Sequence, residues 1–180
     1  PAWVAAVVPG APVLRVDEDH GFGAAVNAGV AAVEGAAFFL VCHDDVRLAP
    51  DVVQVMVEES FRSNAGVVGP KLVSWERPDR LLAVGMGADK LAAPAPLVER
   101  GELDQRQHDT VDDVFYVPSA TMLIRTDLFT TLEGFDPGID VVGDDLELCW
   151  RAHVAGARVI VAPGAGAAHR EAFGERPHAP

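Results

Sequence analysis

The order of apolar and polar positions along the chain predicts strands and helices in alternation. Continuous apolar runs at 37–41, 67–73 and 158–162 are typical of buried strands, and the runs at 114–117 and 120–124 predict two further strand segments. Apolar residues spaced three or four positions apart predict helices over 24–34, 51–62, 125–132 and 144–155. The side chains expected to face the core from these helices are Val26, Val30 and Val33, then Val53, Val57 and Phe61, then Leu146, Trp150 and Val154.

This alternation predicts an α/β sandwich in three layers, with a mostly parallel central sheet. From 75 to 113 the periodicity fades among Pro, Gly and charged residues, which indicates a short hairpin or a loop-rich excursion. A chain of 180 residues is long enough for one core, and because no repeat or linker divides it, we expect a single domain over 1–180. The polar, proline-rich residues 172–180 predict a flexible tail.

Composition and charge exclude several classes of protein. Hydrophobic residues make up 49% and charged residues 23%, as in a folded globular protein. The net charge of −13 argues against a nucleic-acid binder and against a polybasic membrane anchor, and no run of 18 apolar residues exists that could span a bilayer. Two cysteines, Cys42 and Cys149, are too few for a disulfide framework, so we expect a reducing, cytoplasmic compartment.

The first candidate for chemistry is His43-Asp44-Asp45, directly after the strand predicted at 37–41. Ligands of open α/β sheets bind beyond the carboxyl ends of the strands. Alternate positions of an extended segment point to one side, so His43 and Asp45 can share a divalent cation. A polar loop with a helix cap would need similar residues, and the pattern alone leaves both interpretations open.

A second acidic group stands at the start of the helix predicted over 144–155. Asp144, Asp145 and Glu147 follow Gly143 there. Acids in a first turn often only complement the helix dipole. A carboxylate held at a helix start beside a metal site is also a suitable general base.

Three other features carry weaker signals. Gly21 and Gly23 precede a helix that contains Asn27, and free N–H groups at such a start can hold an anion, although a plain helix start requires the same residues. His169 follows the last predicted strand, where a lone histidine is usually a surface residue and occasionally a metal ligand. Trp75, in the loop-rich section, is either a core or rim aromatic or a platform for a sugar.

Taken in order, these motifs resemble a family 2 glycosyltransferase of the GT-A fold. The segments that carry the resemblance are 21–29, 39–51, 69–72, 120–125, 134–137, 144–151, 155–156 and 162–165, followed by His169. Each is loose alone, whereas their order and spacing over residues 12–171 are specific. The resemblance implies transfer of a sugar from a nucleotide-diphosphate sugar to an acceptor hydroxyl, inverting and dependent on Mn²⁺ or Mg²⁺.

The resemblance also assigns roles to residues. The DxD-type motif of the family falls on His43-Asp44-Asp45, with His43 in place of the usual first Asp, and the metal ligands it implies are His43, Asp45 and His169. Asp145 corresponds to the catalytic base. Donor contacts are expected at Asp44, Gly21, Gly23 and Asn27, and acceptor contacts at Asp144, Glu147 and Trp75.

Family members begin with a strand–helix–strand unit. None of this unit precedes Pro12 here, where only residues 3–8 are available, so we expect this sequence to be N-terminally incomplete. The implied setting is polysaccharide or cell-envelope glycan synthesis, with a glycan or lipid-linked acceptor, in the cytoplasm or on the cytoplasmic face of a membrane. Two alternatives remain: a non-catalytic GT-A-like module that binds carbohydrate or acts as a scaffold, and a nucleotidyltransferase, which should carry a basic, Gly-rich phosphate loop.

Overall fold

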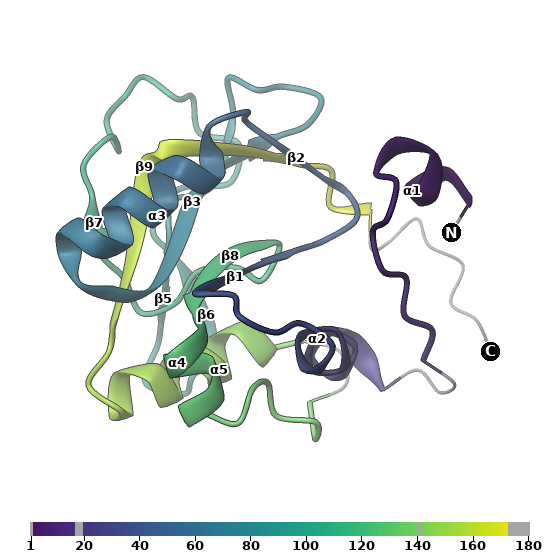
Figure 1. Cartoon of the computed structure of the whole chain (residues 1–180). Coiled ribbons are helices and arrows are strands. Elements are labelled where there is room, and N and C mark those ends of the chain that lie inside the picture. The colour runs from purple at the N-terminus through teal and green to yellow at the C-terminus, as the bar shows by residue number, and fades with distance from the viewer. Residues whose placement is uncertain (1, 17–19, 140–141, 173–180) are drawn as a thin grey trace.

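A computed structural model describes residues 2–16, 20–139 and 142–172 and has a mixed β-sheet at its centre (Figure 1). The predicted tail therefore lies outside the described residues, except for Ala172. In chain order the elements are α1 (Ala2–Val7), α2 (Gly21–Ala31), β1 (Phe38–Cys42), β2 (Val46–Leu48), α3 (Val52–Ser63), β3 (Ala65–Ser74), β4 (Leu81–Ala83), β5 (Met86–Ala88), β6 (Pro94–Pro96), β7 (Asp112–Asp113), β8 (Thr121–Arg125), α4 (Thr126–Thr131), α5 (Asp144–Val154) and β9 (Arg158–His169).

The main sheet has the strand order β1-β8-β3-β9-β2, with β4 added to β3 and β7 added to β9. Only β3 and β9 pair in parallel among the described strands, so the prediction of a mostly parallel sheet is wrong in this respect. Parallel neighbours need a crossover connection, usually a helix. The chain reaches β8 after a hairpin-rich excursion instead of a helix, and β8 enters between β1 and β3 in the opposite direction.

The strands that carry the candidate site nevertheless point the same way. Because β8 is antiparallel to both β1 and β3, these two strands share one direction, and β9 is parallel to β3. The carboxyl ends of β1, β3 and β9 therefore lie at one edge of the sheet. That edge also holds the beginning of β8, where Thr121 is opposite Cys42.

Helices cover both faces of the sheet, as predicted for a sandwich. On one face lies α3 (Figure 1), whose Val52 and Met56 pack in one cluster with Val68, Leu123 and Ile160. On the other face α5 packs through its buried residues Leu146, Leu148, Cys149 and Ala152, together with Phe129 and Phe135 and the inner side of α2. This burial of apolar surface is the main stabilising contribution to the fold.

The helices lie close to the predicted ranges, and Val26, Val30, Val57 and Leu146 pack against the core as predicted. The other side chains predicted to face the core do not. Val53 and Phe61 of α3 are 47% and 73% exposed, and Trp150 and Val154 of α5 are 50% and 78% exposed. Val33, beyond the end of α2, is also exposed. The physical reason is rotation of each helix about its axis: small or polar residues such as Ser60 and Ala152 pack closely against the sheet and leave larger apolar side chains outside.

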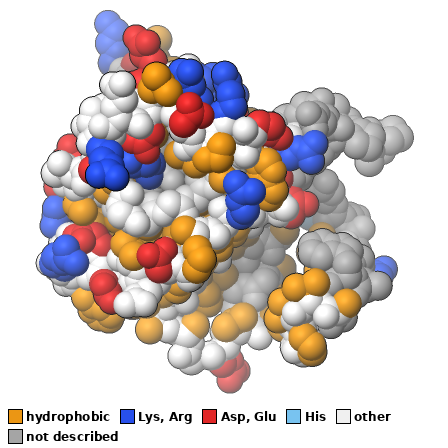
Figure 2. All heavy atoms as spheres, turned by 90° about the horizontal axis from the view of Figure 1, so that it is seen from above, with side chains coloured by type: hydrophobic (Ala, Val, Ile, Leu, Met, Phe, Trp, Pro, Cys, Tyr) orange, Lys and Arg blue, Asp and Glu red, His pale blue; other side chains and the backbone are white. Residues whose placement is uncertain are grey.

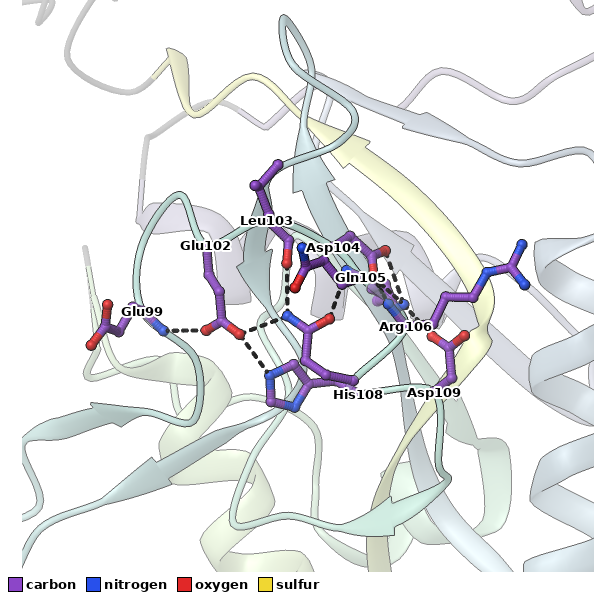
Figure 3. A network of polar contacts seen from close by, with 10 residues as sticks. Glu99, Glu102, Leu103, Asp104, Gln105, Arg106, His108 and Asp109 are labelled. Atoms are coloured by element: carbon purple, nitrogen blue, oxygen red, sulfur yellow. Dashed lines mark hydrogen bonds and ion pairs between the residues drawn. The ribbon is translucent and has the colours of Figure 1, made fainter.

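The excursion between β3 and β8 contains a two-stranded hairpin, β5–β6, as the fading periodicity predicted. Its 99–109 loop is ordered by polar contacts, in which Glu102 accepts hydrogen bonds from Gln107 (2.7 Å) and from the Glu99 amide (3.1 Å) (Figure 3). The nearly buried Lys71 of β3 forms ion pairs with Asp104 and Asp109. These contacts attach the loop to the central sheet.

Acidic and basic side chains are interspersed over the face of the molecule seen in Figure 2. This distribution gives that face no broad basic surface among its described residues. Within the described part of the chain, every helix is too short or too polar to cross a bilayer.

Candidate active site

Three residues that are distant in sequence meet at the carboxyl edge of the sheet. His43, Asp45 and His169 each place one potential ligand atom within 4.8 Å of the others. Nε2 of His169 lies 3.1 Å from Oδ1 of Asp45, and Nδ1 of His43 lies 3.9 Å from the same oxygen. The structure thus brings together the three residues that the sequence proposed as metal ligands, while their binding of a metal stays a prediction.

Strand register explains this meeting. His43 directly follows β1, and its amide donates to the carbonyl of Ala120 (3.0 Å). Val46, at the start of β2, is opposite His169, the last residue of β9. The turn between β1 and β2 must therefore place Asp45 beside the His169 ring.

The segment after β9 holds the Asp45 side chain in place. The amide of Ala172 donates to Oδ2 of Asp45 (2.9 Å), and the amide of Arg170 donates to the Asp45 carbonyl (3.0 Å). One carboxylate oxygen is thus fixed by the backbone, and the other faces the two imidazoles. Such supporting hydrogen bonds orient ligands in metal sites.

The chemistry of these side chains fits a divalent cation. Two imidazoles and one carboxylate form a mixed nitrogen and oxygen set that suits first-row transition metals such as Mn²⁺ better than Mg²⁺, which prefers oxygen ligands. The ring of Phe22 packs edge-on against His43 at 4.6 Å between centroids and limits its rotation. His43, Asp45 and His169 are the residues that would hold the ion.

Asp145 lies at the N-terminus of α5 and accepts two backbone hydrogen bonds. Its Oδ2 accepts from the amide of Ser119 (3.1 Å) and its Oδ1 from the amide of Leu146 (2.8 Å). Burial, and secondarily the charge of Asp144, raise the pKa of Asp145 to about 6. This carboxylate can therefore exchange a proton near neutral pH.

The side chain of Asp144, which is 8% exposed, differs from its neighbour in its contacts. Its Oδ1 accepts from the amide of Asp145 (2.9 Å), while its Oδ2 is buried without a hydrogen-bond partner among the described residues. Burial raises the pKa of Asp144. The two adjacent acids diverge, and of the two it is Asp145 that contacts the turn leading into β8.

Glu147, expected to contact an acceptor, forms an ion pair with Arg151 one turn later (2.5 Å). Arg151 also donates to the carbonyls of Leu132 and Gly134, which follow α4. These contacts connect α5 to the turn after α4. An acceptor role for Glu147 stays a prediction, and the contacts observed here are structural ones.

Two of the expected donor residues pack against Phe135. The Asn27 side chain donates to the carbonyl of Phe135 (2.8 Å) and accepts from its amide (2.9 Å). A Cβ at Gly23 would lie 2.8 Å from Cβ of Phe135, so only glycine allows this close packing. Both residues have a clear structural reason to be present, and their predicted contact with a donor is untested.

The other expected contacts lie around the same part of the molecule. Asp44 is exposed in the turn between β1 and β2. The amide of Trp75 donates to the carbonyl of His169 (3.0 Å), and its ring lies 4.5 Å below the guanidinium of Arg47. A surface hollow of about 570 Å³ beside the start of α2 is lined by Arg15, Val16, His20, Gly21, Ala24, Ala25 and Ala28.

Sequence reasoning missed Ser119, Phe22 and the amides of Arg170 and Ala172. Ser119 is joined to Asp145 through its amide and lies 3.5 Å from Nε2 of His43 through its hydroxyl. A signal was present, because this polar residue stands immediately before the strand segment predicted at 120–124. The other contacts depend on backbone amides and ring packing, which residue type does not report.

Comparisons with known proteins place the chain in a family. The chain matches the family model described as "Glycosyltransferase like family 2" over residues 3–178. It is 30% identical over 162 residues to a pre-mycofactocin glycosyltransferase of Mycobacterium tuberculosis, covering 87% of this chain and 32% of that protein. It is 26% identical over 169 residues to the O-antigen biosynthesis protein RfbC of Myxococcus xanthus, covering 91% of this chain and 13% of that protein.

Among solved structures, GalNAc-T7 crystallised with UDP, GalNAc and Mn²⁺ has the same fold, with a TM-score of 0.69 and 13% sequence identity over 88% of this chain and 32% of that one. The chain spans about a third of the length of the pre-mycofactocin glycosyltransferase. The match to the family model covers nearly every residue, and the fold is that of a GT-A glycosyltransferase. The chain therefore belongs to the glycosyltransferase-like family 2.

Proposed function

We propose that this chain is the catalytic domain of a glycosyltransferase that transfers a sugar from a nucleotide-diphosphate sugar to an acceptor hydroxyl, with inversion. The observation that carries the proposal is the convergence of His43, Asp45 and His169 at the edge of the sheet that also holds Asp145. The presence of UDP and Mn²⁺ in the related GalNAc-T7 crystal supports a similar donor and ion here.

The three converging side chains would hold a divalent cation, with Mn²⁺ favoured over Mg²⁺ by the two imidazoles. When bound, the cation supplies positive charge to the diphosphate, which an acidic protein needs because its own net charge is −13. Asp45 contributes a carboxylate oxygen fixed by the backbone of Ala172 on its other side. The Phe22 ring keeps His43 oriented and adds an apolar wall.

Asp145 is the general base in this proposal. Its pKa of about 6 leaves it ionised at neutral pH yet basic enough to take a proton from an acceptor hydroxyl. The amides of Ser119 and Leu146 hold the carboxylate in one orientation. The proton moves from the acceptor hydroxyl to the carboxylate as the acceptor oxygen attacks the anomeric carbon and the nucleoside diphosphate leaves.

Donor and acceptor would approach from different sides of this centre. The hollow beside α2, with Arg15 and the start of the helix at Gly21, suits part of an anionic nucleotide. Asp44 and Trp75 flank the same edge of the sheet and would contact the two substrates. Two relatives are named as a pre-mycofactocin glycosyltransferase and an O-antigen biosynthesis protein, which favours a glycoside or a polysaccharide as the product. A cytoplasmic location, or one on the cytoplasmic face of a membrane, is part of the proposal.

Calorimetry of this chain with Mn²⁺ and then UDP tests the proposal. We expect Mn²⁺ to bind, and UDP to bind measurably only when Mn²⁺ is present. Release of nucleoside diphosphate from a panel of nucleotide sugars should show the same dependence on the ion. Equal UDP affinity in Mn²⁺ and in EDTA would refute the metal-bridged donor site.

A further inference from the structure

A tight turn places Ser119 between the two halves of the candidate site. The amide of Thr121 donates to the carbonyl of Pro118 (3.2 Å), which closes a turn with Ser119 and Ala120 at its centre. Directly after it, β8 pairs with β1, with Thr121 opposite Cys42. Ser119 is only 5% exposed, so its polar atoms depend on partners inside the protein.

Ser119 contacts two residues that the proposed reaction needs. Its amide donates to Oδ2 of Asp145 on α5 (3.1 Å). Its hydroxyl oxygen lies 3.5 Å from Nε2 of His43, which follows β1. Ser119 thus connects the proposed base Asp145, through its backbone amide, to the candidate metal ligand His43, through its hydroxyl.

Resting on the proposed function, we propose that Ser119 is a positioning residue: its hydroxyl accepts a hydrogen bond from Nε2–H of His43 and so directs the lone pair of Nδ1 toward Asp45 and His169. A neutral imidazole carries one N–H donor and one acceptor nitrogen, and the partner of the first fixes the role of the second. Metal-binding histidines are commonly held by such a contact on their other nitrogen.

The orientation of the ring agrees with this tautomer. Nδ1 of His43 is the nitrogen on the side of Asp45, 3.9 Å from its Oδ1, where a lone pair would serve a cation, and Nε2 is the nitrogen beside the Ser119 hydroxyl, at 3.5 Å. The same Asp45 oxygen is 3.1 Å from His169. Loss of a supporting contact typically lowers metal affinity by about 10–100-fold. Because the Ser119 contact is long, we expect its loss to lower Mn²⁺ affinity by about 10-fold, the lower end of this range.

Two measurements on Ser119→Ala test this role without relying on turnover. In the metal-free, ¹⁵N-labelled chain, long-range proton–nitrogen spectra report which nitrogen of neutral His43 carries the proton. We expect Nε2–H in the wild type and a mixture of both forms in Ser119→Ala. Calorimetry with Mn²⁺ alone should show about 10-fold weaker binding in Ser119→Ala. Ser119→Thr keeps a hydroxyl and should restore both the Nε2–H tautomer of His43 and the wild-type Mn²⁺ affinity.

Ser60→Ala is the matched control, because Ser60 is also buried and its hydroxyl donates to the carbonyl of Ala65 (2.7 Å), outside the candidate site. This variant should change neither the tautomer of His43 nor the Mn²⁺ affinity. Ser119→Ala keeps its amide, so the acidic limb of the pH–rate profile, which reports Asp145, should also stay unchanged.

A proton on Nδ1 of wild-type His43, or an unaltered tautomer in Ser119→Ala, would overturn the assignment. An unaltered tautomer together with normal Mn²⁺ binding by both proteins would reject the role of Ser119 alone and leave the proposed function standing. Failure of the wild type to bind Mn²⁺ would count against the proposed function, while the spectra of the metal-free chain would still decide the role of Ser119.

Discussion

Nε2 of His169 lies 3.1 Å from Oδ1 of Asp45, although 124 positions separate the two residues in the chain. The contact joins the end of β9 to the turn between β1 and β2, and the backbone of Ala172 holds the same carboxylate from its other side. A carboxylate and imidazoles arranged in this way are suited to share a cation.

Replacing His169 with Ala should weaken Mn²⁺ binding by about 100-fold or more, because it removes a direct ligand and not only a supporting contact, whose loss typically costs 10–100-fold. Calorimetry with Mn²⁺ measures the effect. His108→Ala is the control, since His108 contacts Glu102 in the 99–109 loop and should leave the affinity unchanged. If both variants lost Mn²⁺ affinity equally, the loss would reflect histidine removal in general, and the prediction for His169 would be wrong.

Asp145→Asn should lower kcat by about 10²–10⁴-fold, because the amide cannot accept the acceptor proton. Mn²⁺ affinity should change little, since His43, Asp45 and His169 are left in place. Steady-state kinetics on the active protein, beside calorimetry, separate the two effects. Asp144→Asn is the comparison and should act mainly on acceptor KM or on stability; if Asp145→Asn turns over at nearly the wild-type rate, Asp144 becomes the candidate base.

The stability of the wild type relative to Asp145→Asn should fall as the pH rises. The pKa of Asp145 is raised in the folded chain from an ordinary 3.8 to about 6, so the folded state holds the proton more tightly than the unfolded state does. The associated stability is present in full below about pH 4 and is lost as the pH rises through 6. Urea unfolding in EDTA from pH 4.5 to 7.5 should show Asp145→Asn gaining about 2 kcal/mol on the wild type over this range. A constant difference across this range would contradict the raised pKa.

Asn27→Ala should lower the free energy of unfolding by about 2–4 kcal/mol, because it leaves the amide and carbonyl of the buried Phe135 without their two side-chain partners. Urea unfolding measures this loss, and Gln54→Ala, at an exposed position of α3, should cost much less. UDP affinity under conditions where Asn27→Ala is folded tests the donor role separately. A large loss of affinity with little loss of stability would favour a donor contact over the structural one.

The candidate site was more predictable than the sheet that supports it. Motifs such as His43-Asp44-Asp45 and Asp144-Asp145 have characteristic spacing, and their order along the chain indicated the family that the comparisons then showed. Strand direction leaves no such local mark. Nothing in the apolar run at 120–124 distinguishes an inserted antiparallel strand from a parallel one, because both bury the same side chains.

Residue type and period thus determined the alternating elements, the helix ranges and the set of polar residues at strand ends. Tertiary structure alone decided how each helix is rotated, so that Met56 is buried while Phe61 is exposed, because only the shape of the opposing sheet selects which face fits. It also decided that Asn27 binds the backbone of Phe135, and that Ser119 lies between Asp145 and His43. These contacts join residues far apart in sequence, and their distances are fixed by strand register and helix packing, which no local pattern specifies.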